Sequence, residues 1–203
     1  MQLDKKHWYD GWFYDNIIAP NQDTMFKLIS SLITGNSSVI DLGCGTGRLD
    51  FQLATKCKSV TGVDLSSKNI KTALNHLNNS KLKNIEFIHG SAANILKSGK
   101  KYDYAIITYV IHEIPLKERS EFLSSIREFS NKIIIGDYLV PRTKGVWNSL
   151  NEAVEFAAGR DHYKNFKLFV KNGGIISLIK ENKFEILKEI KNRPFTSHIV
   201  MIK

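Results

Sequence analysis

Cysteine is scarce in this chain, and long apolar runs are absent from it. The two cysteines, Cys44 and Cys57, indicate neither a disulfide framework nor a cysteine metal site. No apolar stretch approaches the length that crosses a bilayer, and the N-terminus lacks the apolar core of a signal peptide. We therefore expect no membrane partner and a reducing, cytoplasmic location.

Arginine is also rare, and the sequence has no dense basic segment, no repeats and no low-complexity linker. Lysine and arginine together outnumber the acidic residues by 29 to 20, which gives a formal net charge of +9. Because the lysines are spread along the whole chain, this charge favours a solvated surface over a face that binds RNA. Length and composition predict a single globular domain over residues 1–203.

The most informative segment is the run of residues 39–47, Val-Ile-Asp-Leu-Gly-Cys-Gly-Thr-Gly. Its β-branched residues predict the end of a buried strand with Asp41 at the tip, and a helix is expected to begin just after Gly47. Glycines let the backbone adopt positive φ and approach a ligand closely. The helix N-terminus adds unpaired N–H groups. The segment therefore predicts a turn that binds a nucleotide-like ligand through its backbone.

The spacing of the glycines separates the candidate ligands. A dinucleotide-binding turn requires a glycine where this chain has Arg48, which disfavours an NAD-dependent oxidoreductase. A phosphate-binding P-loop requires a Gly-Lys-Ser/Thr sequence, and none follows. Asp64 ends the next apolar run, at a distance where an acid commonly binds ribose hydroxyls through two hydrogen bonds. The alternative for Asp64 is a helix N-cap, a role that Ser66 could also fill.

Strand-like and helix-like segments alternate along the chain, which predicts an α/β fold. Helical apolar spacing occurs at 25–32, 70–77 and 122–129, with Pro115 marking the start of the last helix. After the first strand, further strands are expected at 60–63, 85–89, 104–108 and 133–137, followed by a hairpin formed by 184–190 and 197–202.

The pattern Asp-x-Gly-x-Gly-x-Gly at 41–47, followed by Asp64, resembles the class I S-adenosylmethionine (SAM) methyltransferases of the small-molecule type. The resemblance covers residues from about 36 to 203. It implies a Rossmann-like, doubly wound sheet of seven strands, mostly parallel with an antiparallel C-terminal strand and helices on both faces. It also implies that SAM is the cofactor, S-adenosylhomocysteine the product, and a small molecule the acceptor of the methyl group at O, N or S.

The resemblance assigns cofactor contacts to the ends of the first four strands. These residues are Asp41, Gly43, Cys44, Gly45, Gly47, Asp64, Leu65, Ser91, Ala92 and Thr108, to which we add Tyr14 from the N-terminal segment. Ser91 stands where the family often has an acid that contacts adenine, so its contact would be uncharged. Asp41 is expected to help hold the amino group of the donor, and Asp64 its ribose.

The acceptor side is predicted from two histidines. His112 precedes an Ile-Pro pair, as a histidine often does in small-molecule methyltransferases, and His162 lies in the later segment Gly-Arg-Asp-His-Tyr. Both are candidate general bases, although a histidine that caps a turn explains His112 equally well. A metal site combining these histidines with Glu113 and Asp137 has no ligand spacing in its favour, so we expect none.

Two segments are expected to cover the substrate. Residues 1–35 form an aromatic lid and a helix, and residues 138–174 form an insertion with two amphipathic stretches. The apolar residues of these stretches, Trp147, Leu150, Val154 and Ala157 in one and Tyr163, Phe166 and Val170 in the other, favour core positions over pocket positions. The residues predicted to contact the substrate are Tyr9, Trp12, Glu113, Arg160 and Tyr163.

The alternatives that remain are an RNA methyltransferase that uses the lysine-rich surface and a SAM-binding module without catalysis. A monomer and a homodimer fit the sequence equally well.

Overall fold

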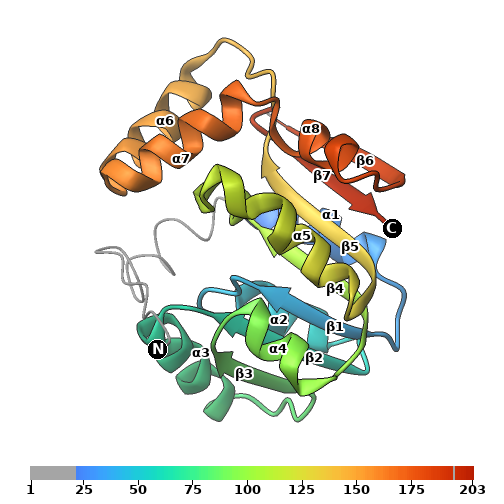
Figure 1. The fold of residues 1–203 in the computed structure, drawn as a ribbon. Coiled ribbons are helices and arrows are strands. Elements are labelled where there is room, and N and C mark those ends of the chain that lie inside the picture. Colours follow the sequence, from blue (N-terminus) through green and yellow to red (C-terminus); the bar gives the residue numbers. More distant parts are fainter. Residues whose placement is uncertain (1–21, 194) are drawn as a thin grey trace.

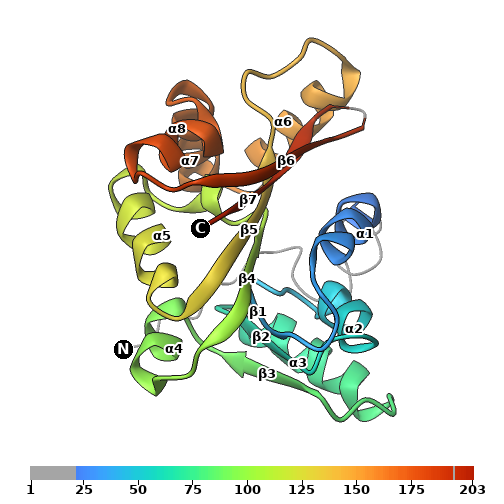
Figure 2. The same ribbon diagram turned by 90° about the vertical axis from the view of Figure 1, so that its right-hand side faces the viewer.

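The computed structural model of this protein describes residues 22–193 and 195–203. Its centre is a seven-stranded sheet with the order β3-β2-β1-β4-β5-β7-β6 (Figures 1 and 2). The strands are β1 (Ser38–Leu42), β2 (Ser59–Asp64), β3 (Ile85–His89), β4 (Tyr102–Thr108), β5 (Ser130–Tyr138), β6 (Ile186–Asn192) and β7 (Ser197–Ile202). Strands β1 to β5 pair in parallel, and β7 runs antiparallel to both of its neighbours. The predicted sheet is therefore confirmed.

Helices cover both faces of this sheet, as expected for a doubly wound fold. They are α1 (Asp23–Leu32), α2 (Arg48–Ala54), α3 (Ser67–Asn78), α4 (Ala92–Ser98), α5 (Arg119–Arg127), α6 (Val146–Ala157), α7 (Arg160–Lys171) and α8 (Gly174–Glu181), with 3₁₀ turns η3 (Ile111–Glu113) and η4 (Leu116–Glu118). In Figure 2, α1, α2 and α3 lie on one face, and α4, α5, α7 and α8 lie on the other. Among the described helices, none is both long and apolar enough to span a membrane.

The strands build two hydrophobic layers because their side chains alternate between the faces. Ile106 packs with α1 and α2, whereas its neighbour Ile107 packs with α5, α7 and α8. Both are fully buried. Near-continuous apolar strands are typical of parallel sheets, in which helices cover both sides.

Element boundaries differ modestly from those expected. Strands β4 and β5 begin two and three residues earlier than predicted, at Tyr102 and Ser130. The turn after Pro115 is 3₁₀, and the α-helix begins only at Arg119. Here the proline occupies the position before a turn, where its lack of an N–H costs nothing.

The structure corrects the expectation for α6. Its apolar residues are exposed, with 62% of Trp147, 51% of Leu150 and 49% of Val154 accessible, so the prediction that this stripe belongs to the core is wrong. The buried positions of this helix are polar, Asn148 and Glu155. Helix α7 follows the expected pattern, because Phe166 is fully buried in the core.

Candidate functional site

The glycine turn after β1 has a backbone that only glycine adopts readily. Gly43, Gly45 and Gly47 all have positive φ, at 85°, 56° and 82°. A Cβ atom on Gly43 would lie 2.3 Å from the Val110 side chain, and one on Gly47 would lie 2.4 Å from the ring of Phe87. The turn is thus specified by backbone conformation and by close packing, and α2 begins directly behind it.

Asp64 joins the end of β2 to this turn. One of its carboxylate oxygens accepts a hydrogen bond from the N–H of Gly45 at 2.9 Å, and the other accepts one from the N–H of Ser66 at 2.8 Å. A carboxylate oxygen can accept more than one hydrogen bond. The carboxylate is therefore held in a defined position at the mouth of the glycine turn.

A cavity of about 670 Å³ opens at the C-terminal ends of the parallel strands, where β1 lies between β2 and β4. The order of the strands reverses at this point, which is the usual ligand position in open α/β sheets. Seven of the predicted cofactor residues line the cavity together: Gly43, Gly45, Asp64, Leu65, Ser91, Ala92 and Thr108. Of the remaining predictions, Cys44 is buried outside the lining, and Gly47 packs on Phe87.

Asp41 lies beneath the turn and does not line the cavity. It is 1% exposed and interacts with Asp50 of α2, which is fully buried. Burial and the negative charge of Asp64 raise the pKa of Asp41 to about 7. Burial and the charge of Asp41 also raise the pKa of Asp50 well above its ordinary value. Both carboxyl groups therefore bind a proton more tightly than a solvent-exposed aspartate does.

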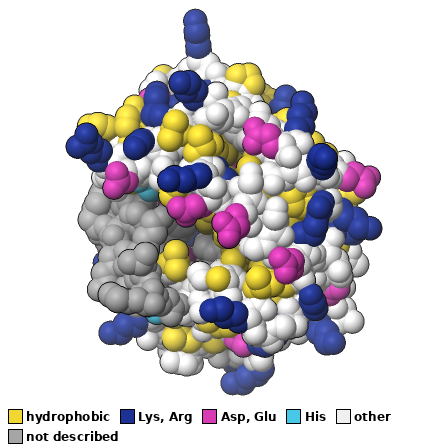
Figure 3. All heavy atoms as spheres, viewed as in Figure 1, with side chains coloured by type: hydrophobic (Ala, Val, Ile, Leu, Met, Phe, Trp, Pro, Cys, Tyr) yellow, Lys and Arg dark blue, Asp and Glu magenta, His cyan; other side chains and the backbone are white. Residues whose placement is uncertain are grey.

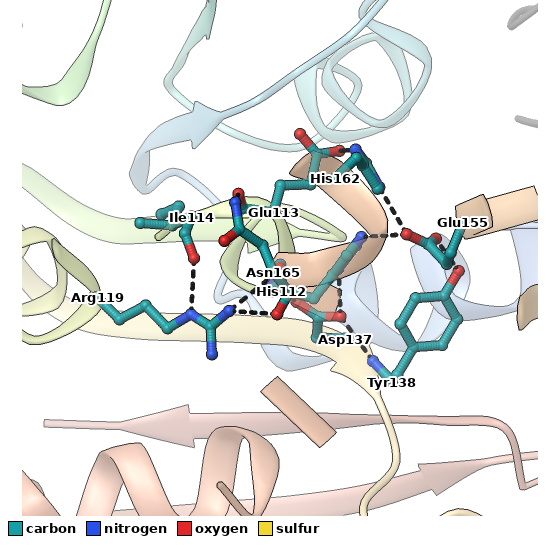
Figure 4. Close-up of polar contacts among 9 residues, drawn as sticks. All are labelled: His112, Glu113, Ile114, Arg119, Asp137, Tyr138, Glu155, His162 and Asn165. Carbon is teal, nitrogen blue, oxygen red and sulfur yellow. Dashed lines mark hydrogen bonds and ion pairs between the residues drawn. The ribbon is translucent and has the colours of Figure 1, made fainter. Parts of the chain in front are cut away.

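The other end of the cavity contains the two predicted histidines. His112, Glu113, Tyr138, Glu155 and His162 all line it, and they come from η3, β5, α6 and α7 (Figure 4). Nε2 of His162 lies 2.6 Å from a Glu155 oxygen, and Nε2 of His112 lies 3.4 Å from that same oxygen. The Tyr138 hydroxyl donates to the second oxygen of Glu155 at 2.6 Å. Chain segments far apart in sequence thus meet around one carboxylate.

His112 is held from its other side by Asp137. Its Nδ1 lies 2.8 Å from the Asp137 carboxylate, which also accepts hydrogen bonds from the backbone N–H groups of His112 and Tyr138. Burial alone would lower the pKa of His112, but the charges of Asp137 and Glu155 outweigh it and raise this pKa well above its ordinary value. Both ring nitrogens therefore face carboxylates, which is an unfavourable arrangement for a simple general base.

Arg119 fixes the backbone around the histidines. Its guanidinium donates to the carbonyl oxygens of Ile114 at 2.9 Å, His112 at 3.2 Å and Asn165 at 2.7 Å. The Asn165 side chain in turn donates to the carbonyl of Glu113 at 2.8 Å. These contacts tie α7 to the turn that follows β4, as Figure 4 shows.

The predicted substrate contacts fall into three groups. Glu113 lines the cavity, whereas Arg160 is exposed and does not. Tyr163 donates its hydroxyl to Glu152 of α6 at 2.8 Å and likewise lies outside the lining. Tyr9 and Trp12, together with Tyr14 and the rest of the predicted lid over 1–21, lie outside the described residues.

Sequence reasoning did not select Tyr138 or Glu155 for the site, and it named Asp137 only in a metal site that it expected to be absent. Asp137 had a usable signal, because it is an acid near the end of a parallel strand, as Asp41 and Asp64 are. Glu155 had a weaker one, since its seven-residue spacing from Asn148 places two polar residues on one face of α6. Tyr138 carried none.

Residues 33–195 match the sequence profile of a protein family described as a methyltransferase domain. A probable cobalt-precorrin-6B C(15)-methyltransferase (decarboxylating) from Methanobrevibacter smithii is 27% identical over 183 residues, 87% of this chain and 94% of that protein. An uncharacterized RNA methyltransferase from Mycoplasma mobile is 36% identical over 83 residues, which are 41% of this chain and 23% of that protein.

The fold is likewise similar to that of a solved structure. Magnesium protoporphyrin IX methyltransferase from Synechocystis with bound S-adenosylhomocysteine superposes with a TM-score of 0.63 at 20% identity, covering 90% of this chain and 81% of that one.

Proposed function

This chain belongs to the methyltransferase-domain family of SAM-dependent enzymes, and from that premise we propose that it methylates a small molecule at O, N or S. The cavity supports this proposal because different chemical groups line its two ends. One end is lined by the backbone of the glycine turn and by the carboxylate of Asp64. The other end is lined by histidine and carboxylate side chains and by the apolar side chains of α6.

We assign SAM to the end formed by the glycine turn. Asp64 would accept hydrogen bonds from the ribose hydroxyls, with Leu65 against the adenine. Ser91 and Ala92 lie beyond them, at the start of α4. Thr108 and the turn of Gly43 would then surround the methionine part. Asp41 would act through charge beneath the turn, since it does not reach the cavity.

We assign the acceptor to the end that contains His112, His162 and Glu113. In the transfer, a lone pair of the acceptor atom forms a bond to the methyl carbon of SAM. The S–C bond breaks with its electron pair remaining on sulfur, which yields S-adenosylhomocysteine. Alignment of donor and acceptor supplies roughly 7–11 kcal/mol in such reactions, so the walls that position the acceptor matter more than any single base.

The observation that carries the assignment is the position of Asp64, held by two backbone N–H groups at the mouth of the glycine turn. We predict that Asp64→Asn lowers SAM affinity at least about tenfold, because an amide replaces the charged acceptor of two ribose hydroxyls. Isothermal titration of the full chain with SAM measures this loss.

Asp103→Asn is the matched control for this experiment. Asp103 is also an aspartate on a strand of the sheet, but it lies at the opposite edge, where it bonds Ser38. It should retain wild-type SAM affinity. Equal affinities for wild type and Asp64→Asn would remove the assignment.

An RNA acceptor is the second candidate, and the partial likeness to an RNA methyltransferase favours it. That likeness covers under half of this chain. We prefer the small-molecule acceptor because the Lys and Arg side chains on the face shown in Figure 3 are scattered among acidic ones. Both cysteines are buried free thiols, which agrees with the cytoplasmic location that we propose.

A further inference from the structure

We propose that His112, His162 and Glu113 form a binding site for a divalent transition-metal ion at the acceptor end of the cavity. Each of the three residues offers one ligand atom, and these atoms lie within 4.8 Å of one another. The two histidines are buried, and Glu113 is half-buried at the cavity wall. Imidazole and carboxylate ligands of this number suit Zn²⁺, Fe²⁺ and related ions.

The surroundings of His112 match those of a metal-bound histidine. Such a histidine usually donates its other ring N–H to a carboxylate, which orients the ring. Asp137 takes this role at Nδ1, 2.8 Å away, and is itself held by two backbone N–H groups. The arrangement directs Nε2 of His112 toward His162 and Glu155, as Figure 4 shows.

Glu155 lies beside the three ligands and contacts both histidines. One of its oxygens lies 3.4 Å from Nε2 of His112 and 2.6 Å from Nε2 of His162. The ligand atoms that all lie within 4.8 Å of one another belong to His112, Glu113 and His162. Three protein ligands leave an open fourth position on a tetrahedral ion, as in catalytic zinc sites.

Two separate elements deliver the three ligands, which is why spacing along the sequence carried no sign of them. His112 and Glu113 belong to η3, and His162 belongs to α7. The guanidinium of Arg119 fixes the backbone of η3 and α7 relative to each other. An ion bound here would join α7 to the turn that follows β4.

Charge supports the same occupant. Glu113, Glu155 and Asp137 bring three carboxylates to the two histidines within one partly buried cluster. A divalent cation at this position would offset part of their negative charge.

The site faces the acceptor end of the cavity, which points to an acceptor with a coordinating hydroxyl. Its oxygen would bind the ion and lose its proton to a buffer base more readily. That oxygen would then form the bond to the methyl carbon, and the sulfur of SAM would retain the electron pair. This catalytic role rests on the proposed function, whereas metal binding itself does not.

The test is isothermal titration calorimetry of the chelator-treated full chain with Zn²⁺. We expect one ion to bind per chain. Co²⁺ provides a second readout, because its visible absorption reports imidazole and carboxylate coordination. His162→Gln and Glu113→Gln should each lower the affinity by roughly 10–100-fold or more. Glu113→Gln is the gentler variant, since this side chain is half-buried.

His198→Gln is the matched control. His198 is also buried and lies 3.0 Å from a carboxylate, that of Glu189, but it belongs to β7 outside the cluster. Its Zn²⁺ affinity should equal that of the wild type. Wild-type protein that binds no Zn²⁺, or variants of the cluster that bind it as tightly as the wild type, would overturn the proposal.

SAM titrations of the same proteins separate the two proposals. Retained SAM affinity in His162→Gln together with lost Zn²⁺ affinity supports the metal site. A wild type that binds SAM but no Zn²⁺ overturns the metal site and leaves the proposed function intact. A wild type that binds Zn²⁺ but no SAM supports the metal site and contradicts the proposed function.

Discussion

At the scale of single residues, the pair of buried carboxyl groups beneath the glycine turn is the most unusual feature. Asp41 and Asp50 are nearly inaccessible to solvent, and both have raised pKa values. In the unfolded chain, the same groups ionise near pH 4. From about pH 4 to about pH 7, the folded protein therefore binds more protons than the unfolded chain does. The contribution of these two groups to the unfolding free energy is fully present below about pH 4 and is lost as the pH rises through the folded-state pKa values.

We predict that Asp50→Asn weakens this pH dependence. The amide does not titrate, so the variant lacks the proton that the raised pKa of Asp50 lets the folded wild type hold. Each proton held only in the folded state makes the wild type lose up to about 1.4 kcal/mol of unfolding free energy per pH unit. Urea unfolding at several values between pH 5 and pH 8 measures the slope. Asp161→Asn, which changes an exposed carboxylate, should retain the wild-type slope, and an unchanged slope in Asp50→Asn would contradict the prediction.

At the scale of elements, α6 reverses the usual arrangement of an amphipathic helix. Its polar residues Asn148 and Glu155 are buried, and its apolar residues are exposed or line the cavity. The buried polar groups are all paired, since Glu155 meets Tyr138 and His162, and Asn148 bonds Thr143 and Arg142. Burial of paired polar groups is tolerated, and the apolar face is left available for a ligand. We infer that the acceptor has an apolar part.

Trp147 is the largest apolar side chain that α6 presents to the cavity. We predict that Trp147→Ala lowers kcat/KM for the acceptor about tenfold or more, mainly through KM, because contact with the indole ring is lost. SAM affinity should not change. Turnover of SAM with an accepted small molecule measures both constants.

Val146→Ala is the control for this experiment, because Val146 is 74% exposed on the same helix and does not line the cavity. An equal loss in both variants would show that α6 acts only as a scaffold.

At the scale of the whole molecule, the net charge of +9 is not concentrated on the face shown in Figure 3, where Lys and Arg side chains are scattered among acidic ones. We predict that RNA binds weakly and that its affinity depends little on salt, because few phosphates are neutralised at once. Filter-binding or fluorescence titrations between 50 and 200 mM salt measure the slope of log K against log salt. A steep slope, equivalent to six or more phosphates, would favour the RNA methyltransferase instead.

The sheet, its two layers and the end of the cavity that we assign to SAM could be predicted because their signals are local. The glycines at 43, 45 and 47 report a backbone conformation that other residues avoid. Near-continuous apolar runs report strands buried on both sides. Asp64 follows from its place at the end of a strand. These properties depend on neighbours within a few residues along the chain.

The end of the cavity that we assign to the acceptor was decided only by the tertiary structure. His112, Asp137, Glu155 and His162 lie on four different elements, and only the folded chain brings them into contact. The periodicity of α6 reported that an apolar face exists, but periodicity cannot say whether that face meets the core or a cavity. Sequence therefore determined the fold and the end of the cavity to which we assign the donor. The packing of distant helices against the end of the sheet determined which side chains line the end that we assign to the acceptor.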